Sequence, residues 1–129
     1  MGNDDRLLRW VGTSLDDLKE FPSDVQSRMG FALRTAQEGG RDPDAMPLQG
    51  FGGAGVIEIA ERFDGNAYRT MYTVRLRHAV YVLHAFQKKS THGIATPARE
   101  MNTVRRRLRE AELLDAAETA RQQNRGETT

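Results

Sequence analysis

The stretch Ala79-Val80-Tyr81-Val82-Leu83-His84-Ala85-Phe86-Gln87-Lys88-Lys89-Ser90 decides how this chain folds. Its first eight residues are apolar, β-branched or aromatic apart from His84, a composition typical of a buried strand. The stretch ends on Lys88 and Lys89, the only adjacent lysines in a chain of 16 arginines and three lysines. A buried strand that ends in two lysines holds positive charge at a fixed place, and the expected ligand for such charge is a phosphodiester backbone.

The composition predicts one soluble globular domain. The chain has 129 residues, of which 38% are hydrophobic and 29% charged, and this length allows a single modest core. It has no cysteine, which excludes disulfides and thiolate metal sites. No apolar run reaches the roughly 20 residues of a membrane helix, and no signal peptide is visible. We therefore expect a cytoplasmic protein, with a domain over residues 1–118 and a polar, frayed tail over 119–129.

The net charge of +1 hides an uneven distribution of charge along the chain. Residues 62–109 hold 11 basic side chains against two acidic ones, whereas the remainder holds eight basic and 16 acidic. A basic segment of this kind favours a nucleic-acid partner, and an acidic remainder favours solubility or a basic partner.

The pattern before residue 56 predicts a strand, two helices and a loop. Leu7–Val11 is a short apolar run ended by glycine, and helices are expected to begin at Ser14 and Ser23. Together the two helices predict a helical hairpin packed on a sheet. Residues 39–55 read as a glycine-rich loop with a G-x-G-x-x-G pattern. Because a strand follows this pattern where a nucleotide site needs a helix, we interpret the loop as a connector.

The second half predicts a three-strand meander and a final helix. The strands are expected at 56–63, 67–75 and 79–86, with a turn at residues 64–66. Alternation in the middle strand puts Arg69 and Met71 on one face and Tyr72 on the other. Thr96-Pro97 is a typical helix start, and the apolar stripe of that helix is Met101, Val104, Leu108 and Ala111. The predicted fold class is α+β, with the helical hairpin on a small, mainly antiparallel sheet.

Several segments are similar to a known family. They are Trp10–Ser14, Phe21-Pro22, Pro47–Gly52, Tyr68–Tyr72, Val80–Lys89 and Gly93–Pro97. In this order they resemble the HigB-like (phage Gp49-related) branch of the RelE/ParE toxin superfamily, over roughly residues 9–112. The resemblance implies a RelE/ParE-like fold and a toxin of a bacterial type II toxin–antitoxin module.

The resemblance also implies an activity and partners. Such toxins are endoribonucleases (mRNA interferases) that usually cut ribosome-bound mRNA, inhibit translation and are neutralised by a small helix-turn-helix antitoxin. A toxin–antitoxin heterotetramer is one assembly it allows. No cofactor is expected, and no metal site is expected because the acids at 16, 17 and 20 have no ligand spacing with any histidine.

The resemblance assigns the expected catalytic residues. Arg69 falls at the catalytic arginine of a Tyr-Arg strand, where its permanent charge suits phosphate binding. Lys88 and Lys89 fall at the basic end of the last strand, and His84 is a further candidate acid or base. The predicted RNA-binding residues are Arg62, Tyr72, Arg75, Arg77, Phe86, Gln87 and His92. Glu58 and Ala60 stand where relatives carry lysines, so the lysine general base is not reproduced.

Each of these residues also has a structural alternative. Arg69 can be a surface arginine, the lysines a solvated pair, and His84 a hydrogen-bonded core residue. The arginines at 105–109 can contact ribosomal RNA, dock an acidic antitoxin or simply face solvent. Two further functions stay open: a ParE-like inhibitor of DNA gyrase without nuclease activity, and an inactive regulatory protein.

Overall fold

The computed structural model describes residues 5–88 and 96–127, so Lys89 and His92 lie outside the described residues. The elements are β1 (Leu7–Trp10), α1 (Ser14–Lys19), α2 (Ser23–Gln37), β2 (Ala45–Pro47), the 3-10 turn η1 (Gly52–Ala54), β3 (Val56–Phe63), β4 (Asn66–Thr73), β5 (Ala79–Lys88) and α3 (Ala98–Glu127). The predicted α+β class is confirmed. None of the helices in the described part of the chain has the length and apolarity needed to span a membrane.

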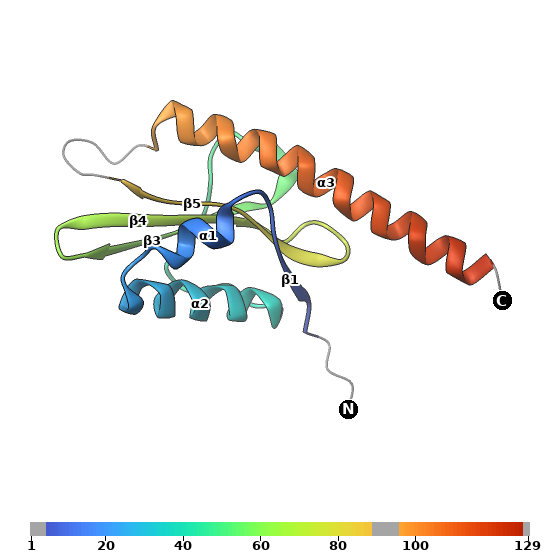
Figure 1. Cartoon of the computed structure of the whole chain (residues 1–129), viewed down its shortest axis with the longest axis horizontal. Coiled ribbons are helices and arrows are strands. Elements are labelled where there is room, and N and C mark those ends of the chain that lie inside the picture. Colours follow the sequence, from blue (N-terminus) through green and yellow to red (C-terminus); the bar gives the residue numbers. More distant parts are fainter. Residues whose placement is uncertain (1–4, 89–95, 128–129) are drawn as a thin grey trace.

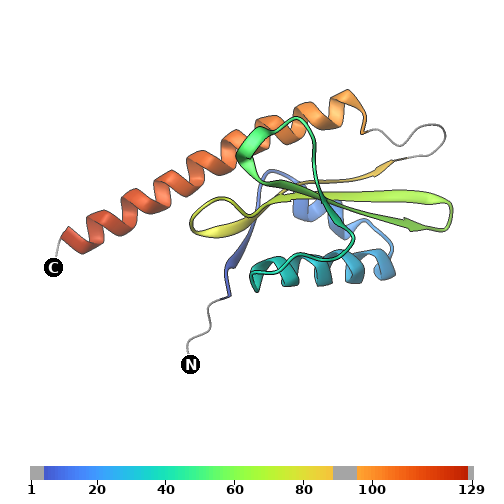
Figure 2. The same cartoon turned by 180° about the vertical axis from the view of Figure 1, so that it is seen from behind.

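The five strands form one sheet in the order β1-β5-β4-β3-β2. β1 pairs with β5 in parallel, and the other neighbours are antiparallel. Helix α3 crosses one face of the sheet and α2 covers the other (Figures 1 and 2). The predicted N-terminal hairpin consists of two unequal helices, since α1 has six residues and α2 has 15. The RelE/ParE topology itself stays a prediction.

The apolar stretch that begins at Ala79 forms β5, and the first eight residues of this strand are buried. Val80 and Val82 pack with the core of α2, whereas Tyr81 and Leu83 pack with Val104 of α3. Because both faces of this strand are covered, it needs apolar side chains at successive positions. This explains why the sequence shows a continuous apolar run here and no alternation.

The β3–β4 hairpin confirms the predicted meander and turn. Asp64 and Gly65 connect the strands with φ of 53° and 81°, the left-handed conformation of a two-residue hairpin turn. The alternation in β4 is also as predicted, because Met71 packs on the α3 side and Tyr72 on the α2 side.

The predicted loop 39–55 needs a correction, because it contains the edge strand β2. Ala45 lies opposite Ile59 and Pro47 opposite Ile57 of β3. A proline is tolerated there because the outer side of an edge strand needs no amide donor. Gly55, the last glycine of the G-x-G-x-x-G pattern, has φ of 68°, and a Cβ there would lie 2.0 Å from Cγ of Arg75. Backbone conformation and packing therefore account for this glycine.

Helix α3 is longer than the sequence suggested. It begins at Ala98 and continues through residues 119–127, the segment that we expected to be a frayed tail. Its second half extends beyond the sheet (Figure 1). The domain boundary at residue 118 stays a prediction.

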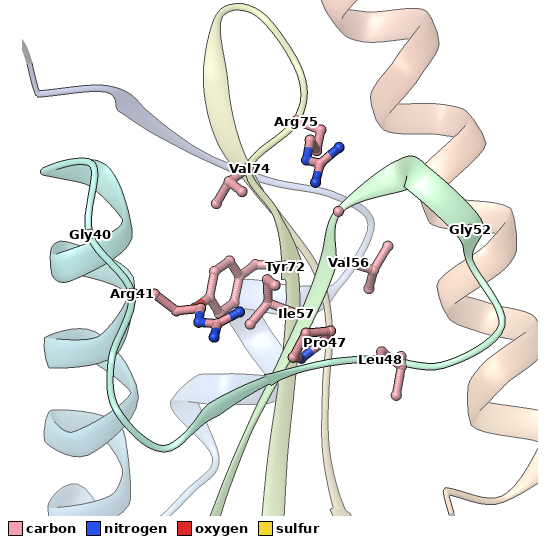
Figure 3. A pocket seen from close by; sticks show the side chains of 11 residues that line it. Gly40, Arg41, Pro47, Leu48, Gly52, Val56, Ile57, Tyr72, Val74 and Arg75 are labelled. Atoms are coloured by element: carbon pink, nitrogen blue, oxygen red, sulfur yellow. The ribbon is translucent and has the colours of Figure 1, made fainter.

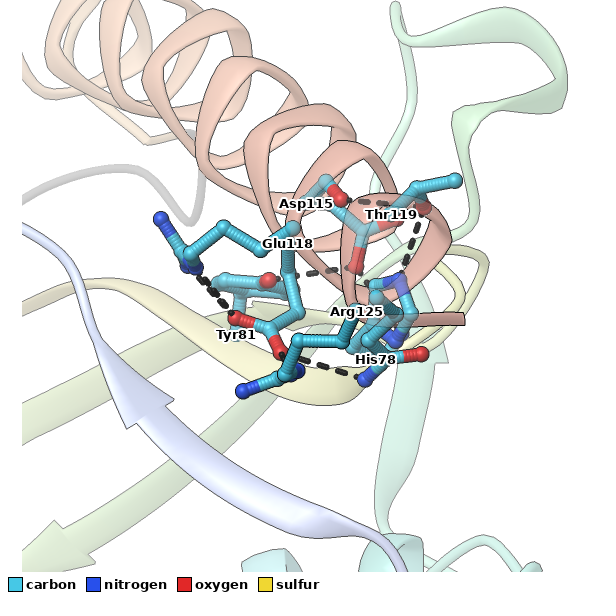
Figure 4. A network of polar contacts seen from close by, with 8 residues as sticks. His78, Tyr81, Asp115, Glu118, Thr119 and Arg125 are labelled. Carbon is cyan, nitrogen blue, oxygen red and sulfur yellow. Dashed lines mark hydrogen bonds and ion pairs between the residues drawn. The ribbon is translucent and has the colours of Figure 1, made fainter. Parts of the chain in front are cut away.

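The connection between β4 and β5 is fixed by hydrogen bonds from two sides. Arg6 donates to the carbonyl oxygens of Val74 at 2.7 Å and of Ala79 at 3.0 Å. From α3, the buried carboxylate of Asp115 accepts from the amides of Arg77 and His78, each at 2.8 Å, and from the Tyr81 hydroxyl at 3.1 Å (Figure 4). This network fastens the middle of α3 to the start of β5.

The charge of Asp115 is stabilised where it lies. Burial alone would raise the pKa of this carboxyl, but the amides of Arg77 and His78 and the Tyr81 hydroxyl outweigh burial and lower the pKa below its ordinary value. Burial and the bond to Asp115 raise the pKa of Tyr81 to about 12. Because the folded-state pKa of Asp115 is depressed, its contribution to stability is present above the unfolded pKa of about 4 and is lost as the pH falls through the folded value.

We predict that Asp115→Asn lowers the free energy of unfolding by about 2 kcal/mol at pH 7, since an amide cannot accept all three hydrogen bonds. Urea denaturation followed by circular dichroism measures this loss. The difference from the wild type should begin to shrink as the pH falls below about 4, the unfolded pKa, and should vanish once the pH passes the lower folded-state pKa of Asp115. The matched control is Glu112→Gln on the exposed side of the same helix. An equal effect in both variants would contradict the role given to Asp115.

Candidate active site on the α3 face of the sheet

Arg69 lies on the α3 face of β4 in a cluster of polar side chains. Its Nη1 is 3.1 Å from Oε2 of Glu58 on β3 and 3.1 Å from Oγ1 of Thr96. Thr96 also donates to the same Glu58 oxygen at 3.3 Å. The Arg69 side chain is 13% exposed and that of Glu58 16% exposed. The guanidinium is therefore held in one place at the edge of solvent and is neither loose nor fully buried.

The end of β5 brings further candidates to the same face. Arg69 lies directly opposite Phe86 in the register of β4 and β5. Phe86 stacks on His84 with the ring centroids 5.1 Å apart. Lys88 lies two residues beyond Phe86 and shares its face by alternation. The sequence-predicted residues Arg69, His84, Phe86 and Lys88 are thus brought together.

An irregularity in β5 turns His84 towards α3. Met71 pairs with His84 and Tyr72 pairs with Val82, so Leu83 has no partner residue in β4. Such a β-bulge shifts the alternation of side chains by one residue. Leu83 and His84 consequently both face α3, and without the bulge His84 would have faced α2.

His84 is hydrogen-bonded through both ring nitrogens. Nε2 is 2.7 Å from Oε1 of Glu100, and Nδ1 is 3.3 Å from Nη1 of Arg107. A guanidinium can only donate, so Nδ1 acts as the acceptor and Nε2–H donates to the carboxylate. The contacts therefore select one tautomer and fix the plane of the ring.

Arg107 reaches this site by passing over Gly12. Its Nη1 donates to the carbonyl oxygen of Leu83 at 3.1 Å and its Nη2 to Thr13 at 3.0 Å. A Cβ at Gly12, which has φ of 59°, would lie 2.7 Å from Nε of Arg107. Burial lowers the pKa of Arg107 from its ordinary value. The side chain thus supports the bulge and orients His84 at the same time.

The other sequence-predicted residues are distributed over the molecule. Arg62 is exposed on β3, on the face of Glu58 by alternation, and Gln87 is exposed on β5. Tyr72 is 1% exposed and packs on the α2 side, which keeps it from the Arg69 cluster. Arg75 and Arg77 follow the opposite end of β4. The structure therefore does not bring Tyr72, Arg75 or Arg77 to this site.

A cavity of about 260 Å³ lies away from the Arg69 cluster. It is lined by Arg41, Leu48, Ile57, Tyr72 and Arg75, beneath the segment that follows α2 (Figure 3). Burial raises the pKa of Tyr72 to about 12. The cavity shares no lining residue with the polar cluster around Arg69 and His84, so the two are separate features.

Sequence analysis did not assign Glu100 and Arg107 to the site, although their spacing held a signal. Glu100, Val104, Arg107 and Ala111 are separated by four, three and four residues, which places them on one helix face. Val104 and Ala111 are buried on that face. Charged residues in register with a core stripe indicate side chains turned inward, whereas the sequence analysis gave the arginine run only roles in contacts with partners or solvent.

The arrangement combines a fixed cation with acid–base groups. A guanidinium next to a carboxylate can bind phosphate and exchange a proton, and an imidazole bonded to a second carboxylate can do the same. Among the described residues, no three histidine, aspartate or glutamate side chains come together in a way that could hold a metal ion. The described groups suit general acid–base chemistry on a phosphodiester.

One comparison with known proteins gives a match. The family model described as phage-derived protein Gp49-like (DUF891) matches residues 16–109. Neither the curated proteins nor the solved structures contain a significant match to the chain. The matched residues include Arg69, His84, Glu100 and Arg107, so the whole polar cluster apart from Gly12 and Thr13 lies inside the family region.

We predict that Gly12→Ala displaces Arg107 and changes the tautomer balance of His84. Alanine is strained at positive φ and meets the guanidinium, so the free energy of unfolding should also fall by more than about 1 kcal/mol. Long-range ¹H–¹⁵N spectra of the imidazole report the tautomer directly. The control is Gly30→Ala, where nothing lies within 4 Å of the added Cβ; within a helix it should stabilise the protein by about 0.5–1 kcal/mol. Unchanged His84 signals in Gly12→Ala would contradict the assignment.

Proposed function

Because this chain belongs to the Gp49-like family, a family of RelE/HigB-like toxins, we propose that it is an mRNA endoribonuclease. Proteins of this family are generally toxins of toxin–antitoxin modules, which implies an antitoxin partner. In our proposal the toxin cleaves ribosome-bound mRNA without a metal ion and thereby stops translation, and a small helix-turn-helix antitoxin neutralises it.

The observation that carries this proposal is the grouping of Arg69, His84 and Lys88 on one face of the sheet. Arg69 and Phe86 face each other across β4 and β5, and the other two residues flank Phe86. Diagonal neighbours on adjacent strands lie about 7–8 Å apart, within reach of long side chains. One phosphate can therefore be contacted from both strands.

The proposed reaction is attack of the ribose 2′-oxygen on the adjacent phosphorus, with loss of the 5′-oxygen. Arg69 stabilises the charge that builds up on the phosphoryl oxygens; a well-placed donor of this kind contributes roughly 3–4 kcal/mol to the barrier. A guanidinium has five N–H donors, so it can hold a carboxylate and a phosphate together. Glu58, in contact with Arg69, accepts the 2′-hydroxyl proton, and Lys88 supplies a proton to the leaving oxygen.

Inhibition of DNA gyrase is the second candidate function, and the Arg69–Glu58 ion pair favours it. The pair is 3.1 Å long and partly buried, so the charge of Arg69 is already matched within the protein. In a nuclease, a bound phosphate would have to share the Arg69 guanidinium with Glu58. A protein that only binds gyrase has no need for a phosphate at Arg69, so the ion pair could stay as it is. The absence of lysines at positions 58 and 60 also favours gyrase inhibition over RNA cleavage.

We predict that Arg69→Ala abolishes growth inhibition and lowers the rate of RNA cleavage about 10²–10³-fold. Removal of the arginine also leaves Glu58 without its ion-pair partner, which can destabilise the protein. The double variant Arg69→Ala/Glu58→Ala therefore serves as a second test: it should recover the stability, measured by thermal unfolding, without recovering toxicity. Arg9→Ala, an exposed arginine on β1, is the matched control. Full toxicity in the folded double variant would remove Arg69 from the site.

We predict that brief induction of the wild type produces new 5′ ends within translated reading frames, which primer extension on cellular transcripts detects. A gyrase supercoiling assay on the same protein should show no inhibition. Cleavage complexes of gyrase without mRNA cuts would establish the second candidate. The absence of both effects would contradict both candidates and leave a regulatory partner.

A further inference from the structure

The outer side of α3 carries a basic surface that the proposed reaction does not use. Arg105, Arg106 and Arg109 are exposed, whereas Arg107 of the same run is turned inward to Leu83 and His84. Leu113 follows one turn after Arg109 and is 67% exposed. The segment at Gly50 and Phe51 borders this side of α3 at Arg105 and Arg109, and no strand or α-helix of the described chain lies over it (Figures 1 and 2). We call Arg105, Arg106, Arg109 and Leu113 the outer α3 surface.

Two hollows are formed along this surface, and both have apolar walls. One, of about 430 Å³, is bounded by Arg105, Arg106, Arg109, Glu110 and Leu113, three cations and one carboxylate. The other, of about 230 Å³, is bounded by Phe51, Leu108 and the same Arg105 and Arg109, with Glu112 at its edge. The guanidinium of Arg105 is placed by Asn102, at 3.0 Å, and lies 5.6 Å above the Phe51 ring. Each hollow therefore has an apolar wall rimmed by arginine.

We propose that the outer α3 surface docks an acidic amphipathic helix of the antitoxin. Arginines one helical turn apart match carboxylates at the same spacing on a second helix. Leucine or similar side chains of that helix would enter the hollows next to Leu113 and Phe51, in the way that amphipathic helices fill apolar grooves. The inference rests on the toxin–antitoxin part of the proposed function and does not require the nuclease chemistry.

A helix fits this surface better than RNA does. Binding to the phosphates of RNA needs only exposed cations. The exposed side chain of Leu113, 67% accessible, would add no affinity for phosphate. Past Leu113 the exposed side continues with Ala116, Ala117 and Ala120. This spacing of three and four residues gives a stripe of small apolar side chains that a second helix can approach closely. The exposed arginines and the exposed apolar side chains therefore lie along the same side of α3, where one partner helix can contact both.

The surface and the Arg69 cluster lie on opposite sides of α3. Val104 and Arg107 face the sheet, while the three outer arginines face away from it. A helix docked there leaves Arg69 uncovered, so the antitoxin would act by keeping the toxin from its ribosome-bound substrate. Binding of the antitoxin and integrity of the cleavage site are therefore separable by mutation.

The experiment uses the full chain co-expressed with the protein encoded by the neighbouring reading frame, tagged for purification. We expect Arg106→Glu/Arg109→Glu to weaken the complex about tenfold or more, measured by titration at physiological salt. Arg9→Glu/Arg41→Glu makes the same charge change away from the outer α3 surface and should leave the affinity unchanged. Leu113→Ser should also weaken binding, which a purely electrostatic contact would not show. Hydrogen exchange should slow at residues 105–113 in the complex.

Three results would overturn the inference. The first is a complex that both α3 variants leave intact, which places the antitoxin elsewhere. The second is loss of ribosome binding with unchanged antitoxin binding, which makes the surface an RNA contact. The third is the absence of any complex with the neighbouring protein. In each case the primer-extension experiment still decides whether the toxin cleaves mRNA, so the two proposals fail independently.

Discussion

The fold of the candidate site depends on the contact between Arg107 and the bulge in β5. One extra residue, Leu83, shifts the alternation of the strand and turns His84 to the face of α3. A bulge leaves backbone groups without ladder partners, and Arg107 donates to the Leu83 carbonyl. The same guanidinium bonds His84, so one side chain stabilises the irregular backbone and orients the imidazole that the backbone presents.

This arrangement links residues from distant parts of the chain. Gly12 leaves room for the side chain of Arg107, and the carboxylate of Glu100 accepts a hydrogen bond from Nε2–H of His84. Arg69 is fixed in a similar way by Glu58 and Thr96. Buried or half-buried charges keep their positions because each has hydrogen-bonding partners. Groups placed in advance in this manner need little reorganisation when a charged substrate binds, which is the condition for electrostatic stabilisation of a transition state.

Much of the framework could be predicted from the sequence, because local patterns determine it. The apolar run of β5 indicated a buried strand, Asp64-Gly65 indicated the hairpin turn, and alternation in β4 separated Arg69 from Tyr72. The bulge could not be predicted, since it depends on pairing between strands and not on any residue type. The edge strand β2 was missed because its three residues include Pro47 and lie between Pro43 and Gly50. The roles of Glu100 and Arg107 required the exact face of α3 that meets the sheet, and their spacing with Val104 was the only local signal.

The central claim is that Arg69, His84 and Lys88 form one phosphate site on the α3 face. The most direct measurement is a titration of the protein with a short RNA whose 2′-hydroxyls are methylated, so that it binds without being cut, followed by NMR of side-chain nitrogens. Our account predicts that the signals of the Arg69 guanidinium and the His84 imidazole shift together and saturate at one RNA concentration. Shifts confined to Arg75 and Arg77, or to the outer arginines of α3, would contradict it.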